Sequence, residues 1–315
     1  MTALWHRIPA SSALVRRLAF ASLVANIGIV ITGGAVRLTG SGLGCPTFPR
    51  CTDDSWVTTP EMGVHGAIEF GNRTLTFVLG VIALAGVAAA LRLRAQRPTL
   101  TWWALSILGG IAAQAGIGGL TVLTDLNPWI VGSHFLVSVA LITAAYGFWH
   151  RAGEPDGPAT PTVPASLRTL LWVLVGSTLA LLAVGTVVTG SGPHAGDERV
   201  ARNGLDPQAI SQAHADLAFL VLGLAVAAWF AFRAVSAPPP VIRAAGWLVG
   251  LLLAQGVLGM VQYFTGLPEL LVGLHLLGSC LVWVALLAML FHSRTRHLDP
   301  IHQPMEPVAE LAHSR

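Results

Sequence analysis

The chain has 315 residues, of which 54% are hydrophobic and 10% charged, with a formal net charge of +3. Because a water-soluble domain carries about 25% charged residues, this composition excludes a soluble globular protein and predicts a protein of the lipid bilayer. The high hydrophobicity and the count of three cysteines exclude a disordered chain and a disulfide-rich scaffold. All 18 basic residues are arginines and none forms a dense basic stripe, so we expect no nucleic-acid partner.

Eight apolar runs predict an all-α integral membrane protein with eight transmembrane helices. A helix rises ~1.5 Å per residue, so about 20 apolar residues cross the ~30 Å of hydrocarbon in a bilayer. The first run lacks the small-residue cleavage site of a signal peptide, and we expect it to be retained as a helix. The runs are Leu18–Leu38, Ala67–Leu91, Trp102–Leu123, Trp129–Trp149, Leu170–Thr189, Ala213–Phe232, Ala244–Phe264 and Leu270–Phe291.

The arginines predict the orientation of these helices, because basic residues in short loops stay on the cytoplasmic side. They precede the first run, follow the eighth, and lie in the second-to-third, fourth-to-fifth and sixth-to-seventh connections. The opposite loops, roughly 40–66 and 190–212, hold most of the acidic loop residues. We therefore expect a multi-pass protein of the cell membrane with both termini in the cytoplasm.

The two halves of the chain resemble each other, which indicates an internal duplication. The sequence AQAGIGGLTVLTDLNPWIVGSH (Ala113–His134) matches AQGVLGMVQYFTGLPELLVGLH (Ala254–His275), and AIEFGNRTLTF lies over AISQAHADLAF. We expect two pseudo-symmetric four-helix bundles related by an axis along the membrane normal, each with a cofactor or substrate site between its helices. The predicted parts are an N-terminal bundle over 1–150, a cytoplasmic linker over 151–168, a C-terminal bundle over 169–296 and a cytoplasmic tail over 297–315.

Three histidines lie in the first turns of the fourth, sixth and eighth predicted helices: His134, His214 and His275. Ionisable side chains inside a membrane are costly, which makes them candidates for function, although a hydrogen-bonded core histidine is the alternative for each. Zinc requires three or four clustered ligands, whereas two imidazoles from facing helices suit haem iron. His214 and His275 form such a pair in the second half. In the first half Asn72 stands at the position of His214, which leaves His134 alone.

The segment HGAIEFGNR places His65, Glu69 and Asn72 on one face of the second helix. A carboxylate beside an open haem pocket suits proton abstraction or stabilisation of a cation, while a salt bridge from Glu69 to Arg73 is the structural alternative. Arg37 and Arg73 lie near the outer helix ends. They could pair with haem propionates or extend to lipid phosphates.

Cys45 and Cys51 lie in the first outer loop, within GLGCPTFPRCTDD. The oxidising compartment and the short spacing predict a disulfide, and an exposed disulfide is either structural or redox-active.

Taken together, these motifs resemble haem A synthase, the membrane enzyme that oxidises a methyl group of haem O to the formyl group of haem A. The resemblance covers nearly the whole chain through GGAVRLTGSGLGCP, IEFGNR, VGSH, TGSGPHAGD, QAHAD and VGLH. It implies that His214 and His275 ligate a b-type haem in the second bundle, and that His134 ligates the iron of haem O in the first. Glu69 would match the family's catalytic glutamate, and Cys45–Cys51 its outer-loop disulfide.

The chain departs from the family pattern at Asn72, where many members have a histidine. His65 shares the helix face but lies ~10 Å further out, at ~1.5 Å per residue. Either His65 replaces the missing ligand or the substrate iron is five-coordinate. The second outer loop also lacks a cysteine pair that some members have.

The resemblance implies two successive oxidations at the C8 methyl carbon, with a gem-diol that loses water to give the aldehyde. Glu69 would stabilise positive charge or take a proton from water, while haem b passes electrons to an unidentified acceptor. A haem O synthase is a candidate protein partner, and lipids surround the helices.

Two other classes of function compete with this interpretation. A two-haem cytochrome that moves electrons from quinol across the membrane needs haems near both faces, whereas the candidate ligands all lie towards the outer face. A transporter with parallel repeats would bind no haem at all.

Overall fold

The computed structural model describes residues 12–197 and 199–296, so the predicted cytoplasmic termini and the tail over 297–315 lie outside the described residues. Eight of the described helices are long and apolar enough to cross a membrane, which confirms the predicted all-α fold with eight spans. In chain order the elements are α2 (Ser12–Leu38), η1 (Pro60–Met62), α3 (Gly63–Arg92), α4 (Pro98–Leu123), α5 (Pro128–Ala152), β1 (Ala159–Pro161), α6 (Ala165–Ser191), α7 (Pro207–Ala234), α8 (Pro239–Phe264), α9 (Glu269–His292) and β2 (Arg294–Arg296).

Several helices begin before the apolar runs that predict them, because polar first turns and caps add to them outside the hydrocarbon. Helices α4, α5, α7 and α8 each carry proline in the first turn, where its missing N–H costs no hydrogen bond. The Asn127 side chain accepts a hydrogen bond from the Trp129 N–H at 3.0 Å, and Asp206 accepts one from the Ala209 N–H at 3.0 Å.

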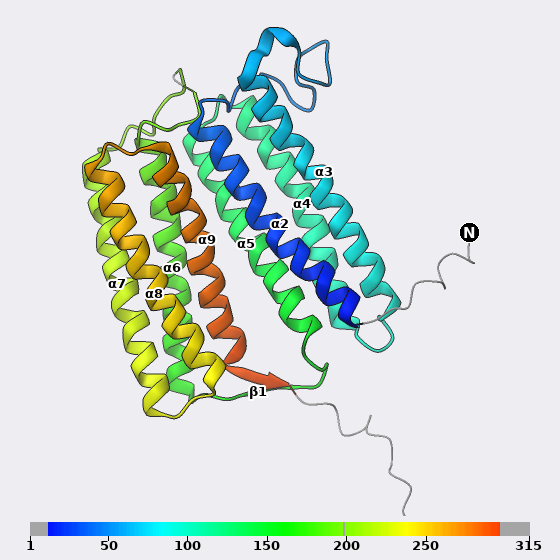
Figure 1. Cartoon of the computed structure of the whole chain (residues 1–315), viewed down its shortest axis with the longest axis vertical. Coiled ribbons are helices and arrows are strands. Elements are labelled where there is room, and N and C mark those ends of the chain that lie inside the picture. The colour runs from blue at the N-terminus through cyan, green and yellow to red at the C-terminus, as the bar shows by residue number, and fades with distance from the viewer. Residues whose placement is uncertain (1–11, 198, 297–315) are drawn as a thin grey trace, which may run out of the picture.

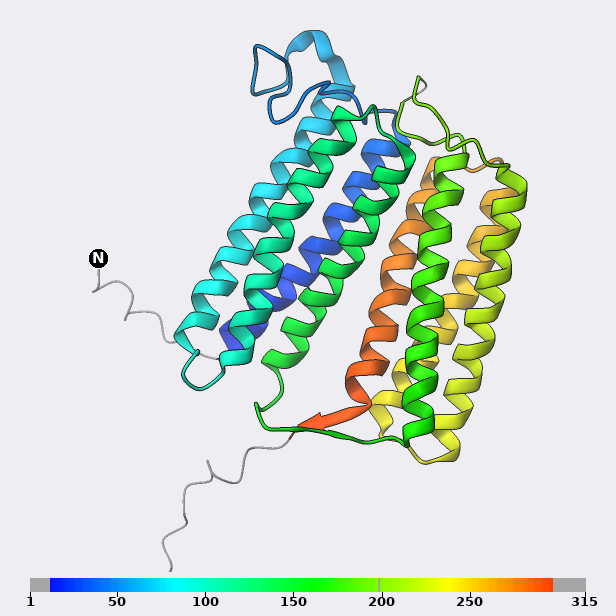
Figure 2. The same cartoon turned by 180° about the vertical axis from the view of Figure 1, so that it is seen from behind.

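The helices form two four-helix bundles, α2–α5 and α6–α9, which stand side by side (Figures 1 and 2). In both bundles consecutive helices are neighbours and the first helix also packs against the fourth. Helices α3 and α5 therefore occupy opposite corners of the first bundle, as α7 and α9 do in the second. The bundles meet where α2 and α5 pack against α9 and α5 packs against α6.

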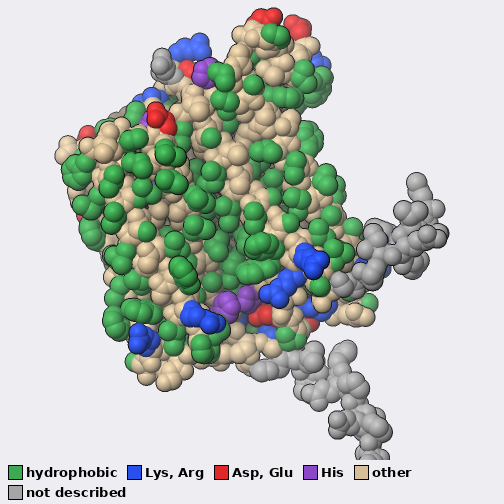
Figure 3. Space-filling model, in the orientation of Figure 1, with side chains coloured by type: hydrophobic (Ala, Val, Ile, Leu, Met, Phe, Trp, Pro, Cys, Tyr) green, Lys and Arg blue, Asp and Glu red, His purple; other side chains and the backbone are tan. Residues whose placement is uncertain are grey.

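The two ends of the bundles differ in their connections. We call the end that carries the α2–α3 loop, with Cys45 and Cys51, the disulfide end, and the end that carries the α5–α6 connection the linker end. The surface between the ends is largely hydrophobic, and charged side chains gather towards the two ends (Figure 3). This distribution is the one expected of a protein surrounded by lipid.

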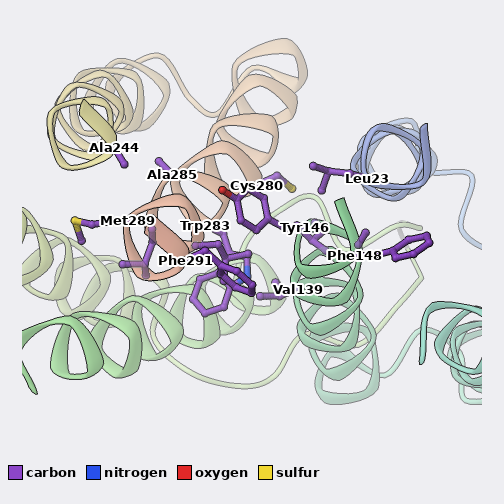
Figure 4. Packing of buried hydrophobic residues seen from close by; sticks show 14 of the residues in the cluster. Leu23, Val139, Tyr146, Phe148, Ala244, Cys280, Trp283, Ala285, Met289 and Phe291 are labelled. Atoms are coloured by element: carbon purple, nitrogen blue, oxygen red, sulfur yellow. The ribbon is translucent and has the colours of Figure 1, made fainter. Parts of the chain in front are cut away.

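Aromatic residues fill the junction between the bundles on the linker side (Figure 4). The Trp283 indole Nε1 of α9 donates a hydrogen bond to the Thr143 hydroxyl of α5 at 2.9 Å. Tyr146 of α5 meets Phe291 of α9 edge to face, with ring centroids 5.4 Å apart. The bundles are thus joined by side chains as well as by the chain connection.

Two short strands, which the sequence does not predict, join the α5–α6 connection to the end of α9 at the linker end. β1 pairs antiparallel with β2, with Ala159 opposite Arg296. The Arg151 guanidinium binds Glu154 at 2.8 Å and Asp156 at 2.9 Å. The segment between the bundles is therefore held against the end of α9 and not only anchored at its two ends.

Candidate functional site

The four main candidate residues lie at one depth in the molecule. Glu69, His134, His214 and His275 each follow the start of α3, α5, α7 or α9 by about two turns. All four helices begin at the disulfide end, so the side chains lie on one level just inside that end.

The two histidines of the second bundle face each other across it. The ring centroids of His214 on α7 and His275 on α9 are 6.4 Å apart, with an angle of 61° between the ring planes. A metal–imidazole bond is about 2 Å long, so two imidazoles on opposite sides of one metal have ring centres roughly 6 Å apart. The observed spacing fits a single metal ion between the rings, as in a haem with two imidazole ligands.

Each of the three imidazoles has one buried ring nitrogen without the hydrogen bond that a purely structural histidine would make. The Nδ1 atoms of His134, His214 and His275 are buried and have no hydrogen-bond partner among the described residues. Most buried polar side-chain atoms in proteins are paired. This observation favours a ligand over the alternative of a hydrogen-bonded core histidine. Within residues 12–197 and 199–296, no three His, Cys, Asp or Glu side chains cluster as a metal site of their own.

Each of the three imidazoles packs against a glycine of the neighbouring helix. A methyl group at Gly118 or Gly185 would crowd the ring, whereas one at Gly259 would make ordinary contact, so the bare backbone lets the imidazoles lie close to the helix. The distance from an added Cβ to the imidazole Cε1 would be 3.2 Å for Gly118 and His134, 3.1 Å for Gly185 and His214, and 3.5 Å for Gly259 and His275. Gly118 and Gly259 occupy matching positions of the internal repeat, so the repeat is the sequence signal that could have revealed these two glycines.

The first bundle has an amide where the second has an imidazole. The Thr32 hydroxyl of α2 donates a hydrogen bond to Asn72 Oδ1 at 2.7 Å. Across the bundle on α5, the His134 carbonyl accepts a hydrogen bond from Gln114 Nε2 at 3.0 Å. Thr32 is forty residues from Asn72 in the chain, so no local motif indicates this contact.

His65 lies in the first turn of α3, at the surface. Its Nδ1 is 2.9 Å from the hydroxyl of Ser41, which is buried in the α2–α3 loop. The imidazole thus makes a loop contact about two turns nearer the disulfide end than Asn72.

Glu69 is 5% exposed, and donors hold both of its carboxylate oxygens. The Cys45 backbone N–H donates to Oε2 at 2.7 Å, and the Arg73 Nη2 donates to Oε1 at 2.5 Å. The salt bridge that the sequence leaves open as an alternative is therefore formed. A carboxylate has about four lone pairs, so Glu69 retains capacity to accept a further hydrogen bond.

The Arg73 guanidinium also fastens the disulfide loop over Glu69. Its Nη1 donates to the Thr47 carbonyl at 2.9 Å and its Nη2 to the Cys45 carbonyl at 3.0 Å. Cys45 and Cys51 form the predicted disulfide and are buried. Arg73 thus directs its donors to protein groups in this loop and to Glu69.

Arg37 connects the two bundles at the same end. Its Nε donates to the His194 carbonyl at 2.5 Å and its Nη2 to the Thr189 carbonyl at 3.0 Å. The His194 ring Nε2 in turn lies 2.7 Å from the Leu267 carbonyl. A side chain of α2 therefore orders the α6–α7 and α8–α9 connections of the other bundle.

His150 and His292 lie in the last turns of α5 and α9, half-buried against each other. Their ring centroids are 4.9 Å apart, closer than the roughly 6 Å of two imidazoles on opposite sides of one metal. His150 Nε2 lies 3.0 Å from Glu154 Oε1, and His292 Nδ1 lies 2.6 Å from the Ala288 carbonyl. This pair is a polar contact between the bundles and does not resemble a second haem site.

Several known proteins are similar to this chain over half of its length or more. The cytochrome oxidase assembly protein family matches residues 16–197, which is more than half of the chain. The Heme A synthase of Symbiobacterium thermophilum is 26% identical over 277 residues, which cover 82% of this chain and 89% of that protein. The Heme A synthase of Bradyrhizobium sp. (strain ORS 278) is 28% identical over 301 residues, covering 78% and 82% of the two chains. That of Geobacillus thermodenitrificans is 32% identical over 120 residues, covering 38% and 37%.

Proposed function

This chain belongs to the haem A synthase family of cytochrome oxidase assembly proteins, and on that premise we propose that it oxidises the C8 methyl group of haem O to the formyl group of haem A. The observation that carries the proposal is the difference between the bundles. One bundle has two half-buried imidazoles 6.4 Å apart, and the other has a single half-buried imidazole and a buried carboxylate at the same level.

In this proposal the second bundle is the cofactor site. His214 and His275 would hold a haem b, which would supply electron transfer between the reaction and an acceptor outside the chain. Gly185 and Gly259 let the two imidazoles lie close to the neighbouring helices, and the apolar helices exclude water from around the site. The orphaned Nδ1 atoms and the ring spacing support this assignment.

The first bundle is the substrate site, where His134 binds the iron of haem O. Conversion of a methyl to a formyl group removes four electrons. The methyl group and one water give the alcohol, two protons and two electrons. The alcohol and a second water give the gem-diol, two more protons and two more electrons. The gem-diol then loses one water to form the aldehyde, so the net reaction consumes one water and releases four protons and four electrons.

Glu69 is the residue that we propose to act on the reacting carbon or on the attacking water. It stabilises positive charge that develops at the methyl carbon, or it takes the proton from water. The Cys45 amide and Arg73 hold the carboxylate in one orientation before the reaction begins. The disulfide loop above it then serves to keep this group in place.

Substitution of Glu69 tests this proposal. The Glu69→Gln protein should keep its haem b absorption spectrum and lose conversion of haem O, with a hydroxylated intermediate trapped if the second oxidation depends more strongly on the carboxylate. Glu61→Gln, in the same loop region and outside the site, is the matched control and should be fully active. Mass analysis of the extracted haems measures both outcomes. Full activity of Glu69→Gln would refute the role of this residue.

We also propose the plasma membrane as the location, with the disulfide end on the outer side, as the arginine distribution predicts. A haem O synthase and an electron acceptor are the proposed protein partners. Electron transfer across the membrane from quinol is not favoured, because the second close imidazole pair in the described residues, at the linker end, has ring centroids only 4.9 Å apart and one nitrogen of each ring in a hydrogen bond within the protein.

A further inference from the structure

We infer that the substrate haem site of the first bundle has one open coordination position, on the side of Asn72, which binds a small neutral ligand, and that the Asn72 amide donates a hydrogen bond to that ligand. This inference rests on the proposed function, since it requires a haem between His134 and Asn72. It adds a ligand-binding position that the second bundle does not have.

Each bundle has one pair of helices at opposite corners that carries the candidate ligands, α3 and α5 in the first bundle and α7 and α9 in the second; we call the line between them the diagonal. In the second bundle the diagonal from α7 to α9 ends in His214 and His275, whose rings face each other. The repeat aligns α3 with α7 and α5 with α9, so the matching diagonal ends in Asn72 and His134. His214 on α7 and Asn72 on α3 each lie beside a glycine of the preceding helix. An added Cβ at Gly185 of α6 would be 3.1 Å from His214 Cε1, and one at Gly33 of α2 would be 3.8 Å from Asn72 Nδ2.

The Asn72 side chain is a poor substitute for the imidazole. An amide nitrogen has no free lone pair for a metal, and the amide oxygen is a hard ligand that suits magnesium or calcium better than haem iron. That oxygen already accepts the Thr32 hydroxyl at 2.7 Å, a shorter contact than the 3.2 Å from this hydroxyl to the Ile29 carbonyl. The amide N–H group makes no hydrogen bond to the described residues and is the group left to donate.

Other candidate ligands in the described part of the first bundle are engaged elsewhere. His65 is held by Ser41 at the surface, and the Met62 sulfur accepts from the Thr58 hydroxyl and lies 3.5 Å from the Cys51 sulfur. His150 lies at the linker end, beside Glu154. Among the described residues His134 is therefore the single imidazole at this level of the first bundle.

A spectroscopic experiment on the full-length protein loaded with haem tests the inference without measuring turnover. Electron paramagnetic resonance of the oxidised protein should show one low-spin haem and one high-spin haem. Carbon monoxide should bind to one of the two reduced haems. Asn72→His should convert the high-spin haem to low spin and weaken carbon monoxide binding at least about tenfold, because the ligand must then displace an imidazole held by about 1.4 kcal/mol or more.

Two further variants test the hydrogen bond. Asn72→Leu has the same number and branching of side-chain heavy atoms and cannot donate, so carbon monoxide should still bind while its C–O stretching frequency rises. Thr32→Val frees the amide to rotate and should shift this frequency in the same direction by a smaller amount. An unchanged frequency in Asn72→Leu would overturn the role of the amide.

The outcomes separate this inference from the proposed function. Two low-spin haems in the unmodified protein, with no carbon monoxide binding, would overturn the open position while leaving haem binding intact. If His65→Ala then produced the high-spin signal, His65 would be the second ligand. If His134→Ala removed neither haem, the proposed substrate site itself would be wrong.

Discussion

Arg73 and Glu69 form an ion pair one helical turn apart on α3, with 2.5 Å between Nη2 and Oε1, and the same guanidinium donates to carbonyls of the disulfide loop. A lysine at this position keeps the charge but lacks the planar fork that reaches several acceptors at once. We expect Arg73→Lys to lower the free energy of unfolding by roughly 1–3 kcal/mol, because buried carbonyls lose charged donors, and to reduce haem O conversion. Thermal unfolding in detergent and haem extraction measure the two effects. Arg50→Lys, an exposed arginine of the same loop, should change neither.

Arg37 should be required for the order of the α6–α7 connection in the other bundle. Arg37→Gln removes the donors to the His194 and Thr189 carbonyls, which leaves polar groups without partners at a cost of roughly 1–3 kcal/mol. Faster amide hydrogen exchange in this connection is the expected result. Arg199→Gln is the matched control, because the exposed Arg199 side chain binds only the Asp197 carboxylate among the described residues. Equal exchange rates in the two variants would contradict the bridging role of Arg37.

Gly185 should control the geometry of the second bundle's imidazole pair. A Cβ at this position would lie 3.1 Å from His214 Cε1, so Gly185→Ala should push the imidazole from its position and broaden or shift the haem b absorption bands. Gly176 lies on the same helix with nothing within 4 Å of an added Cβ, so Gly176→Ala should leave the spectrum unchanged. Identical spectra of the two variants would show that the glycine at 185 is not needed for the site.

The linker end should lose stability in acid because of Glu154. Burial opposes the charged form of this carboxylate, but hydrogen bonds and charges from His150 and Arg151 outweigh it and lower its pKa from 4.5 to about 2. A group with a depressed pKa in the folded state stabilises the fold above its unfolded pKa, and this contribution is lost as the pH falls through the folded pKa. The melting temperature should therefore decline from pH 4.5 towards pH 2. Glu154→Gln should melt lower than the parent protein at pH 7 and decline less in this interval; parallel curves would contradict the assignment.

Hydropathy alone predicts the eight helices, because each must bury about 20 apolar residues in lipid and the bilayer leaves few other folds. The internal repeat also places His134 and His275 at matching positions. The sequence does not predict the β1–β2 pair or the partners of Arg37 and Glu69, since those partners are mostly backbone groups in loops. The Cys45 backbone N–H donates to Glu69, and the conformation of the loop determines where this N–H points, whatever the side chain at that position.

The claim on which the account depends is that His214 and His275 hold a haem between them. The most direct measurement is the absorption spectrum and haem content of the purified protein after His214→Ala and His275→Ala, with His194→Ala as the control for a histidine outside the bundle. The account predicts that either substitution removes the low-spin haem b signal, while the control retains it. Full retention of the pigment in His214→Ala and His275→Ala would contradict the account.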